Sequence, residues 1–129
     1  MSENRFFFIS SKGTLTTLNS VEEVFENHKN GGYFWLDYYQ PTREELSTLI
    51  GPLGLHPLTV EDCTDENLVP KIEEYPNNSF IIFNAFTYAD NILSTDEVDF
   101  IIGKNYLITV SGYFSDGRKP LKDIENDRQ

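Results

Sequence analysis

The segment from Gly54 to Tyr75 reads GLHPLTVEDCTDENLVPKIEEY and predicts a short acidic helix followed by a strand. Pro57 stands at an early helical position, where its missing N–H is tolerated, and the helix is expected to continue to Cys63. The strand is expected from Lys71 to Tyr75. Between Glu61 and Glu74 the chain has one basic residue, Lys71, and six acidic residues: Glu61, Asp62, Asp65, Glu66, Glu73 and Glu74. This concentration of negative potential attracts cations.

The composition favours one compact domain. The chain has 129 residues, of which 39% are hydrophobic and 14% aromatic, enough to fill a single core. Its net charge of -11 argues against a phosphate-binding surface, because nucleic acid and anionic lipid would both be repelled. Cations and basic partners fit this charge, and an acidic surface that only confers solubility is the alternative.

The chain is expected to be water-soluble and not secreted. Its single cysteine, Cys63, forms no internal disulfide, fits a reducing compartment, and is predicted to pack a helix rather than act as a nucleophile. The apolar run Phe6–Ile9 is too short for the core of a signal peptide. No apolar stretch approaches the ~20 residues that a membrane-spanning helix requires.

The first part of the chain predicts a hairpin and a helix. Strands are expected at residues 6–10 and 14–18, with a turn between them. Ser20 and Glu23 fit a capping box, which places the start of a helix there. The segment Asn30-Gly31-Gly32 is expected to end that helix.

A second helix is predicted after an aromatic strand at residues 33–39, whose Trp35 and Leu36 are both expected in the core. A capping box at residues 42–45 marks its start. Apolar residues then follow at helical spacing: Leu46, Leu49, Ile50 and Leu53. Because proline removes a backbone donor and clashes with the preceding turn, the helix should kink or stop at Gly51-Pro52.

The second half of the chain is rich in strands, expected at residues 71–75, 79–88, 97–102 and 106–110. Apolar residues on both faces of 79–88 predict a central strand that is covered on both sides. Gly103-Lys104-Asn105 closes the clearest hairpin. Strands interleaved with helices predict an α/β fold in which a mixed β-sheet is flanked by helices. From Ser111 onward the chain is polar and has little apolar face.

Without further information, Glu61 and Asp62 are more often part of a solvated helix face than a metal site. His56 is either a ligand or a cap for the helix that follows it, and His28 is expected to meet helix-terminal carbonyls or solvent. Asp37 is expected to cap a turn. An enzyme with two catalytic carboxylates is disfavoured, since adjacent side chains diverge on a helix. The sequence has no Ser-His-Asp context, glycine-rich phosphate loop or Cys/His quartet.

Several short motifs occur in order along the chain. They are Trp35-Leu36-Asp37, Pro41-Thr42-x-Glu44-Glu45-Leu46, Gly54-Leu55-His56-Pro57-Leu58, Val60-Glu61-Asp62, Pro70-Lys71-Ile72-Glu73-Glu74-Tyr75 and Gly103-Lys104-Asn105-Tyr106-Leu107-Ile108-Thr109-Val110. Together they closely resemble the CorA family of magnesium and cobalt channels, over about Tyr33 to Val110. Each motif alone is weak, but H-P-L-x-x-E-D followed by P-K-x-E-x-Y and then G-K-N-Y-L-I-T-V is a specific combination.

The resemblance implies a cytoplasmic N-terminal domain with an α/β/α sandwich fold, expected here over residues 1–112. Residues 113–129 are expected to begin the connection to a stalk helix and two membrane spans, in a full-length homopentamer of the cell (inner) membrane. The family's pore motif, Gly-Met-Asn, does not occur in these 129 residues, so this domain is not expected to conduct ions itself. The resemblance also implies a transport protein rather than an enzyme, with divalent cations as ligands and no nucleic-acid partner.

In the CorA family, divalent cations lodge between neighbouring cytoplasmic domains, and the paired acids after His-Pro contribute ligands. The resemblance therefore implies that Glu61 and Asp62 bind a regulatory Mg²⁺ ion, that Co²⁺ or another divalent cation can replace it, and that the bound ion favours the closed channel. Mg²⁺ suits such a site because it retains several waters and needs only one or two carboxylates. Whether His56, Asp65 or Glu66 supplies an additional ligand stays open.

The chain departs from the family pattern in two places. Many relatives carry histidine and arginine just before the Pro70-Lys71 pair, whereas this chain has Asn67, Leu68 and Val69. The Gly51-Pro52 break also shortens the preceding helix. Two alternatives to a magnesium and cobalt transporter stay open: the zinc-transporting branch of the family, and a free-standing interaction module without a membrane part.

Overall fold

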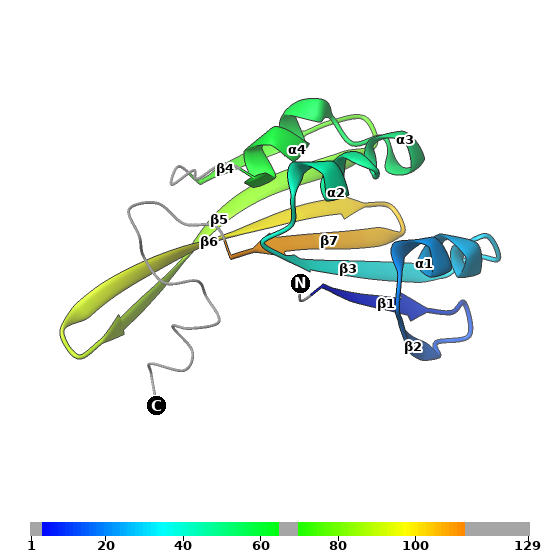
Figure 1. The fold of residues 1–129 in the computed structure, drawn as a ribbon, viewed down its shortest axis with the longest axis horizontal. Coiled ribbons are helices and arrows are strands. Elements are labelled where there is room, and N and C mark those ends of the chain that lie inside the picture. The colour runs from blue at the N-terminus through cyan, green and yellow to red at the C-terminus, as the bar shows by residue number, and fades with distance from the viewer. Residues whose placement is uncertain (1–3, 65–69, 113–129) are drawn as a thin grey trace.

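The computed structural model describes residues 4–64 and 70–112, which form one seven-stranded sheet and a set of short helices (Figure 1). The strand order is β2-β1-β3-β7-β6-β5-β4. The strands are β1 (Arg5–Ile9), β2 (Leu15–Leu18), β3 (Tyr33–Tyr39), β4 (Lys71–Glu74), β5 (Asn78–Ala89), β6 (Ile92–Gly103) and β7 (Tyr106–Ser111). The helices are α1 (Val21–His28), α2 (Arg43–Ser47), α3 (Ile50–Leu53) and α4 (Pro57–Thr64).

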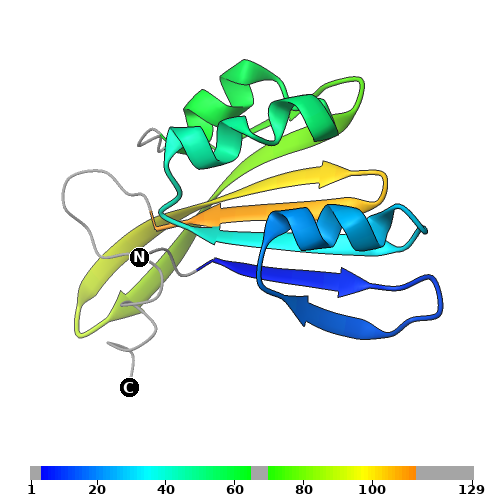
Figure 2. The same ribbon diagram turned by 45° about the vertical axis from the view of Figure 1, so that its right-hand side comes forward.

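The sheet is mixed, because β3 and β7 pair in parallel while the other neighbouring strands pair antiparallel. The predicted mixed sheet flanked by helices is therefore confirmed. Figures 1 and 2 show the described helices on one side of the sheet, with α1 over β1 and β3 and α4 over the end of the sheet that contains β5 and β4. The predicted segment 113–129 lies outside the described residues.

The N-terminal hairpin and the first helix follow the sequence prediction. β1 and β2 pair antiparallel, with Phe6 opposite Leu18. The Ser20 hydroxyl accepts the Glu23 backbone N–H at 3.2 Å and caps the first turn of α1. Phe25 then packs edge-on against Phe34 of β3, with ring centroids 5.8 Å apart, so α1 closes over the sheet.

The predicted second helix is divided into two. Its capping box is present: Thr42 Oγ1 accepts the Glu45 N–H at 3.0 Å, and Glu45 Oε1 accepts the Thr42 N–H at 2.9 Å. The helix ends at Ser47, one turn before the expected break. Pro52 explains this, because its ring has no N–H for the carbonyl of Thr48, four positions earlier, and clashes there. The chain turns and restarts as α3, in which Pro52 needs no partner.

The two faces of the sheet differ in burial, and this corrects one expectation. Leu36 is fully buried beneath the helices, whereas Trp35 points to the opposite face and is 36% exposed. Neighbouring strand residues point to opposite faces, so both side chains cannot enter one core. The Trp35 indole N–H donates to Thr109 Oγ1 at 2.9 Å. Phe83 on the same outer face is 54% exposed, so the described residues do not cover β5 on both sides as predicted.

The long β5–β6 hairpin extends beyond the rest of the sheet (Figure 1). Its turn consists of Asp90 and Asn91, which have positive φ angles of 52° and 63°. Two such residues form the turn type that matches the twist of antiparallel strands. β6 therefore begins at Ile92, five positions before the strand start expected at Glu97.

The core is continuous along one face of the sheet, and its largest fully buried side chains are Phe34, Phe80, Leu36, Leu46, Leu49, Ile82, Ile101, Ile108, Val24, Val110 and Thr59.

Two acidic residues share the buried face of the sheet: Glu97 and Asp99 of β6 are 2% and 1% exposed. Asp99 hydrogen-bonds with Glu97 and with the Cys63 thiol of α4. Burial, followed by the hydrogen bond and negative charge of Glu97, raises the pKa of Asp99 far above its ordinary value. The pair therefore keeps a proton at neutral pH.

Cys63 is buried, as predicted for a packing residue. Burial, together with the acidic pair Asp99 and Glu97, raises the pKa of its thiol well above the usual range. A thiol held in its protonated form is a poor nucleophile, which agrees with the structural role expected for it.

We predict that Gly103→Ala destabilises the fold, because a Cβ at Gly103 would overlap the ring of Tyr106. That ring is fixed, since its hydroxyl donates to Leu53 O at 3.3 Å and accepts from Asn78 at 3.2 Å. The expected loss is about 1–3 kcal/mol in the free energy of unfolding, measured by urea denaturation. Lys104→Ala is the matched control, because it truncates an exposed side chain in the same β6–β7 turn. Equal losses for the two variants would contradict the prediction.

We also predict that the buried acid pair makes stability fall as pH rises. Unfolded Asp99 releases its proton near its ordinary pKa of 3.8, whereas the folded pair retains it. The stability that this proton contributes is therefore complete below pH 3.8 and is lost as pH rises toward the elevated pKa. A variant with both Asp99→Asn and Glu97→Gln removes both carboxyl groups and with them the linkage. Between pH 5 and 9 the wild-type chain should lose up to about 1.4 kcal/mol per pH unit relative to this variant in urea denaturation. If the free energies of unfolding of the wild type and the variant changed with pH in parallel, the prediction would be contradicted.

Candidate functional site

The candidate site lies on α4, the short acidic helix that the sequence predicted. His56 precedes this helix and caps its first turn, because its Nδ1 accepts the Leu58 backbone N–H at 3.1 Å. The imidazole ring stacks on Tyr75, with ring centroids 4.8 Å apart. Of the two roles left open for His56, the structure shows the cap.

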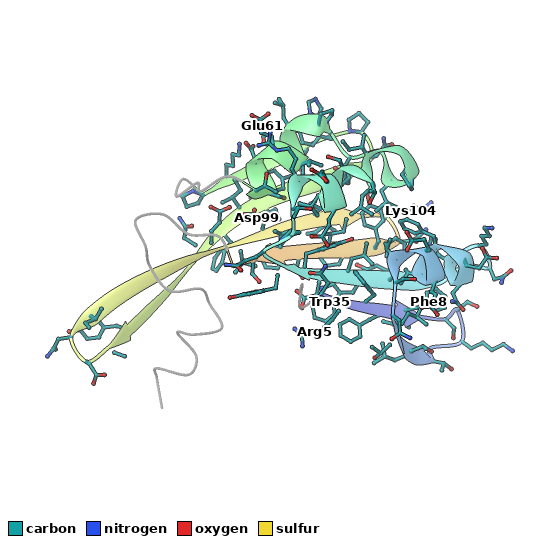
Figure 3. The ribbon with its side chains drawn as sticks, viewed as in Figure 1. Arg5, Phe8, Trp35, Glu61, Asp99 and Lys104 are labelled. Atoms are coloured by element: carbon teal, nitrogen blue, oxygen red, sulfur yellow. The ribbon has the colours of Figure 1, made fainter. Side chains whose placement is uncertain are left out.

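α4 buries one side and exposes the other. Thr59, Val60 and Cys63 face the core. Glu61 lies at the outer surface of the helix, while Asp99 lies on the sheet below it (Figure 3). Asp62 is only partly exposed, so the two predicted ligands differ in their access to solvent. The expected divergence of neighbouring side chains on a helix is therefore present.

Asp62 forms an ion pair within the chain. Lys71 Nζ, at the start of β4, donates to Asp62 Oδ2 at 2.7 Å and lies 3.2 Å from Glu73 Oε1. The side chains of Lys71, Asp62 and Glu73 are 33%, 25% and 39% exposed. The hydrogen bond with Asp62 is the largest cause that raises the pKa of Lys71, which therefore stays charged.

In the sequence, Lys71 beside Glu73 and Glu74 is most simply a surface ion-pair cluster, and this interpretation does not include Asp62. The pair joins residues nine positions apart, on a helix and on the next strand. The signal that would have suggested it is simple: Lys71 is the one basic residue between Glu61 and Glu74. Glu74 lies on the opposite face of β4 from Lys71 and Glu73. Asp65 and Glu66 lie outside the described residues.

In the described part of the chain, no three histidine, cysteine or acidic side chains are grouped so that they could hold a metal ion. Glu61 and Asp62 therefore have no third histidine, cysteine or acidic side chain grouped with them among the described residues. The negative charge of Asp62 also contributes to the raised pKa of buried Asp99, so the ion pair and the buried acid pair interact electrostatically.

Asp37 was expected to cap a turn, but it lies within β3 and links neighbouring strands. It pairs with Arg5 Nη2 at 2.6 Å and accepts a hydrogen bond from Thr109 Oγ1 at 2.7 Å. Thr109 in turn accepts the Trp35 indole N–H. This chain of contacts ties β1, β3 and β7 together on the outer face of the sheet.

A pocket of about 420 Å³ does not contain the predicted ligands. Its lining combines aromatic side chains with two lysines and several polar or apolar residues: Phe25, His28, Lys29, Phe34, Pro52, Leu53, Asn77, Lys104, Asn105 and Tyr106. His28 contacts the ring of Phe34 edge-on, with ring centroids 4.9 Å apart. Among residues 4–64 and 70–112, no helix is long and apolar enough to cross a membrane.

Comparison with known proteins identifies the family. Residues 30–116 match the family model described as CorA-like Mg²⁺ transporter protein. The cobalt/magnesium transport protein CorA of Thermotoga maritima is 27% identical over 106 residues, which make up 80% of this chain and 30% of that protein. The putative metal ion transporter YfjQ of Bacillus subtilis is 31% identical over 77 residues, or 60% of this chain and 24% of the relative. The chain thus spans less than a third of either relative.

Solved structures share the fold. The soluble domain of CorA from Methanocaldococcus jannaschii aligns with a TM-score of 0.60 and 22% identity, and the alignment covers 98% of this chain and 45% of that one. The complete CorA magnesium transporter of the same organism aligns with a TM-score of 0.62 and 24% identity, over 85% of this chain and 32% of the other. The family model covers more than half of the sequence. The chain therefore belongs to the CorA-like Mg²⁺ transporter family.

Proposed function

We propose that this chain is the cytoplasmic, magnesium-sensing domain of a CorA-like magnesium and cobalt transporter. In this proposal Mg²⁺ binds between neighbouring subunits, through Glu61 and Asp62, and favours the closed channel. Co²⁺ or another divalent cation can take the same place. The observation that carries the proposal is the position of α4, which presents Glu61 to solvent in a segment with concentrated negative charge.

One subunit supplies too few ligands for a complete Mg²⁺ site, so we place the site between two subunits. Mg²⁺ keeps several waters and is held by one or two carboxylates, so a single exposed glutamate on each surface is a sufficient protein contribution. A second subunit would supply the remaining ligands. Without the cation, carboxylates about 4 Å apart repel each other by ~1 kcal/mol in water and ~4 kcal/mol in a partly shielded interface. Loss of Mg²⁺ would therefore loosen the contact between the domains.

In the proposed full-length protein, this domain precedes the membrane-spanning part. Residues 1–112 form the regulatory unit, and residues 113–129 begin the connection to the stalk helix and membrane spans of a homopentamer in the cell (inner) membrane. The domain acts by binding cations, not as an enzyme, and the net charge of -11 disfavours a nucleic-acid partner.

The full-length protein provides the test. A variant with both Glu61→Gln and Asp62→Asn should lose magnesium-dependent protection of the cytoplasmic region from protease. Removal of both charges should raise the Mg²⁺ concentration at half-protection by about tenfold or more, which corresponds to the loss of at least about 1.4 kcal/mol of binding free energy.

The control changes the same number of charges elsewhere. Glu22→Gln with Glu44→Gln removes two exposed carboxylates on α1 and α2 and should leave the protection profile as in the wild type. Protection that is unchanged in the Glu61/Asp62 variant would refute the sensor role.

A further inference from the structure

We propose that Lys71 is a built-in counter-ion that competes with divalent cations for Asp62 and thereby sets the cation affinity of the α4 site. This inference rests on the proposed function and assigns a residue that tunes it. Lys71 belongs to β4, at the edge of the sheet, and reaches α4 through its side chain alone.

The ammonium group occupies the position that a cation at Asp62 needs. Lys71 Nζ lies 2.7 Å from Asp62 Oδ2 and 3.2 Å from Glu73 Oε1, so it is held between two carboxylates from two elements. A coordinated Mg²⁺ ion would lie 2.0–2.1 Å from a carboxylate oxygen and would carry its own waters. The ion and the ammonium group cannot both occupy the space next to Asp62 Oδ2. Binding at Asp62 Oδ2 therefore requires that Lys71 withdraws.

Glu73 allows this withdrawal without leaving an unpaired charge. It is the second partner of Lys71, and both residues lie on the same face of β4. When a cation takes Asp62, Lys71 keeps Glu73 as its counter-charge. The exchange is reversible because all three side chains reach solvent, with exposures of 25–39%.

The alternative is an ordinary surface ion pair between α4 and β4. Such a pair contributes little to stability and has no bearing on metal affinity. The two interpretations predict different affinities for divalent cations when the charge of Lys71 is removed. If Lys71 competes, removing its charge tightens cation binding at Asp62. If it only links two elements, removing its charge changes stability slightly and leaves cation affinity as it was.

The experiment uses Mn²⁺ as the probe, with free Mn²⁺ measured by electron paramagnetic resonance in solutions of the 129-residue chain. Lys71→Met and Lys71→Gln should each bind Mn²⁺ about tenfold more tightly than the wild type, since a unit positive charge about 4 Å from the ion is removed. Mg²⁺ should displace the bound Mn²⁺. Lys104→Met is the matched control, because it removes the charge of an exposed lysine in the β6–β7 turn, and its affinity should equal that of the wild type.

A second variant identifies the ligand. Adding Asp62→Asn to Lys71→Met should abolish the tenfold gain. If Lys71→Met and Lys104→Met bound Mn²⁺ with equal affinity, the inference would be overturned. This holds even if Asp62→Asn alone still lowers Mn²⁺ binding. A gain that survives Asp62→Asn would overturn it as well. The sensor role is judged separately, by protease protection of the full-length protein, so the two proposals fail on different results.

Discussion

The parallel pairing of β3 with β7 is the contact on which the rest of the fold depends. It joins two antiparallel groups of strands, β2-β1-β3 and β7-β6-β5-β4, into one sheet. Its register sets Phe34 beside Tyr106 and Leu36 beside Ile108, so the buried positions of both groups form one continuous apolar surface. A parallel pair needs a long crossover, and here the crossover contains α2, α3, α4 and three strands. The same crossover carries α4 to the β5–β4 end of the sheet.

That arrangement also explains why polar groups enter the core beneath α4. The alternation of β6 puts Glu97 and Asp99 on the same face as Ile101, and α4 then covers them with Cys63. A buried carboxylate is costly unless it is neutralised, and the shared proton removes one of the two negative charges of this pair. The neighbouring Asp62 is neutralised differently, by an ammonium group at the surface. At this end of the molecule a proton thus reduces the charge of the buried acidic pair, and an ammonium group reduces the charge of the acidic residues at the surface.

Local signals were sufficient to predict most elements, whereas contacts between distant elements were not predictable. The caps at Ser20 and Thr42 depend on hydrogen bonds within one turn, and the sequence located both. The break before Pro52 was expected in the right helix but one turn too late, since the clash acts on the residue four positions earlier. Trp35 was placed in the core because its aromatic strand is apolar on both faces, and composition alone does not say which face the helices cover. The family motif singled out Asp62 but could not reveal its partner, which approaches from another element.

Glu61 is exposed and Asp62 is only partly exposed, and this difference affects how a sensor of this kind would work. Adjacent helical residues are separated by about 100°, so one carboxylate faces outward while its neighbour turns toward β4. In the proposed function, the outer carboxylate meets a hydrated cation first and the inner one joins only after Lys71 has moved to Glu73. A site assembled in this order binds more weakly than one with two free carboxylates, because part of the binding free energy is used to displace the ammonium group. Weak binding is what regulation requires, since a site that stays saturated over the working range of Mg²⁺ concentrations cannot report a change in that concentration.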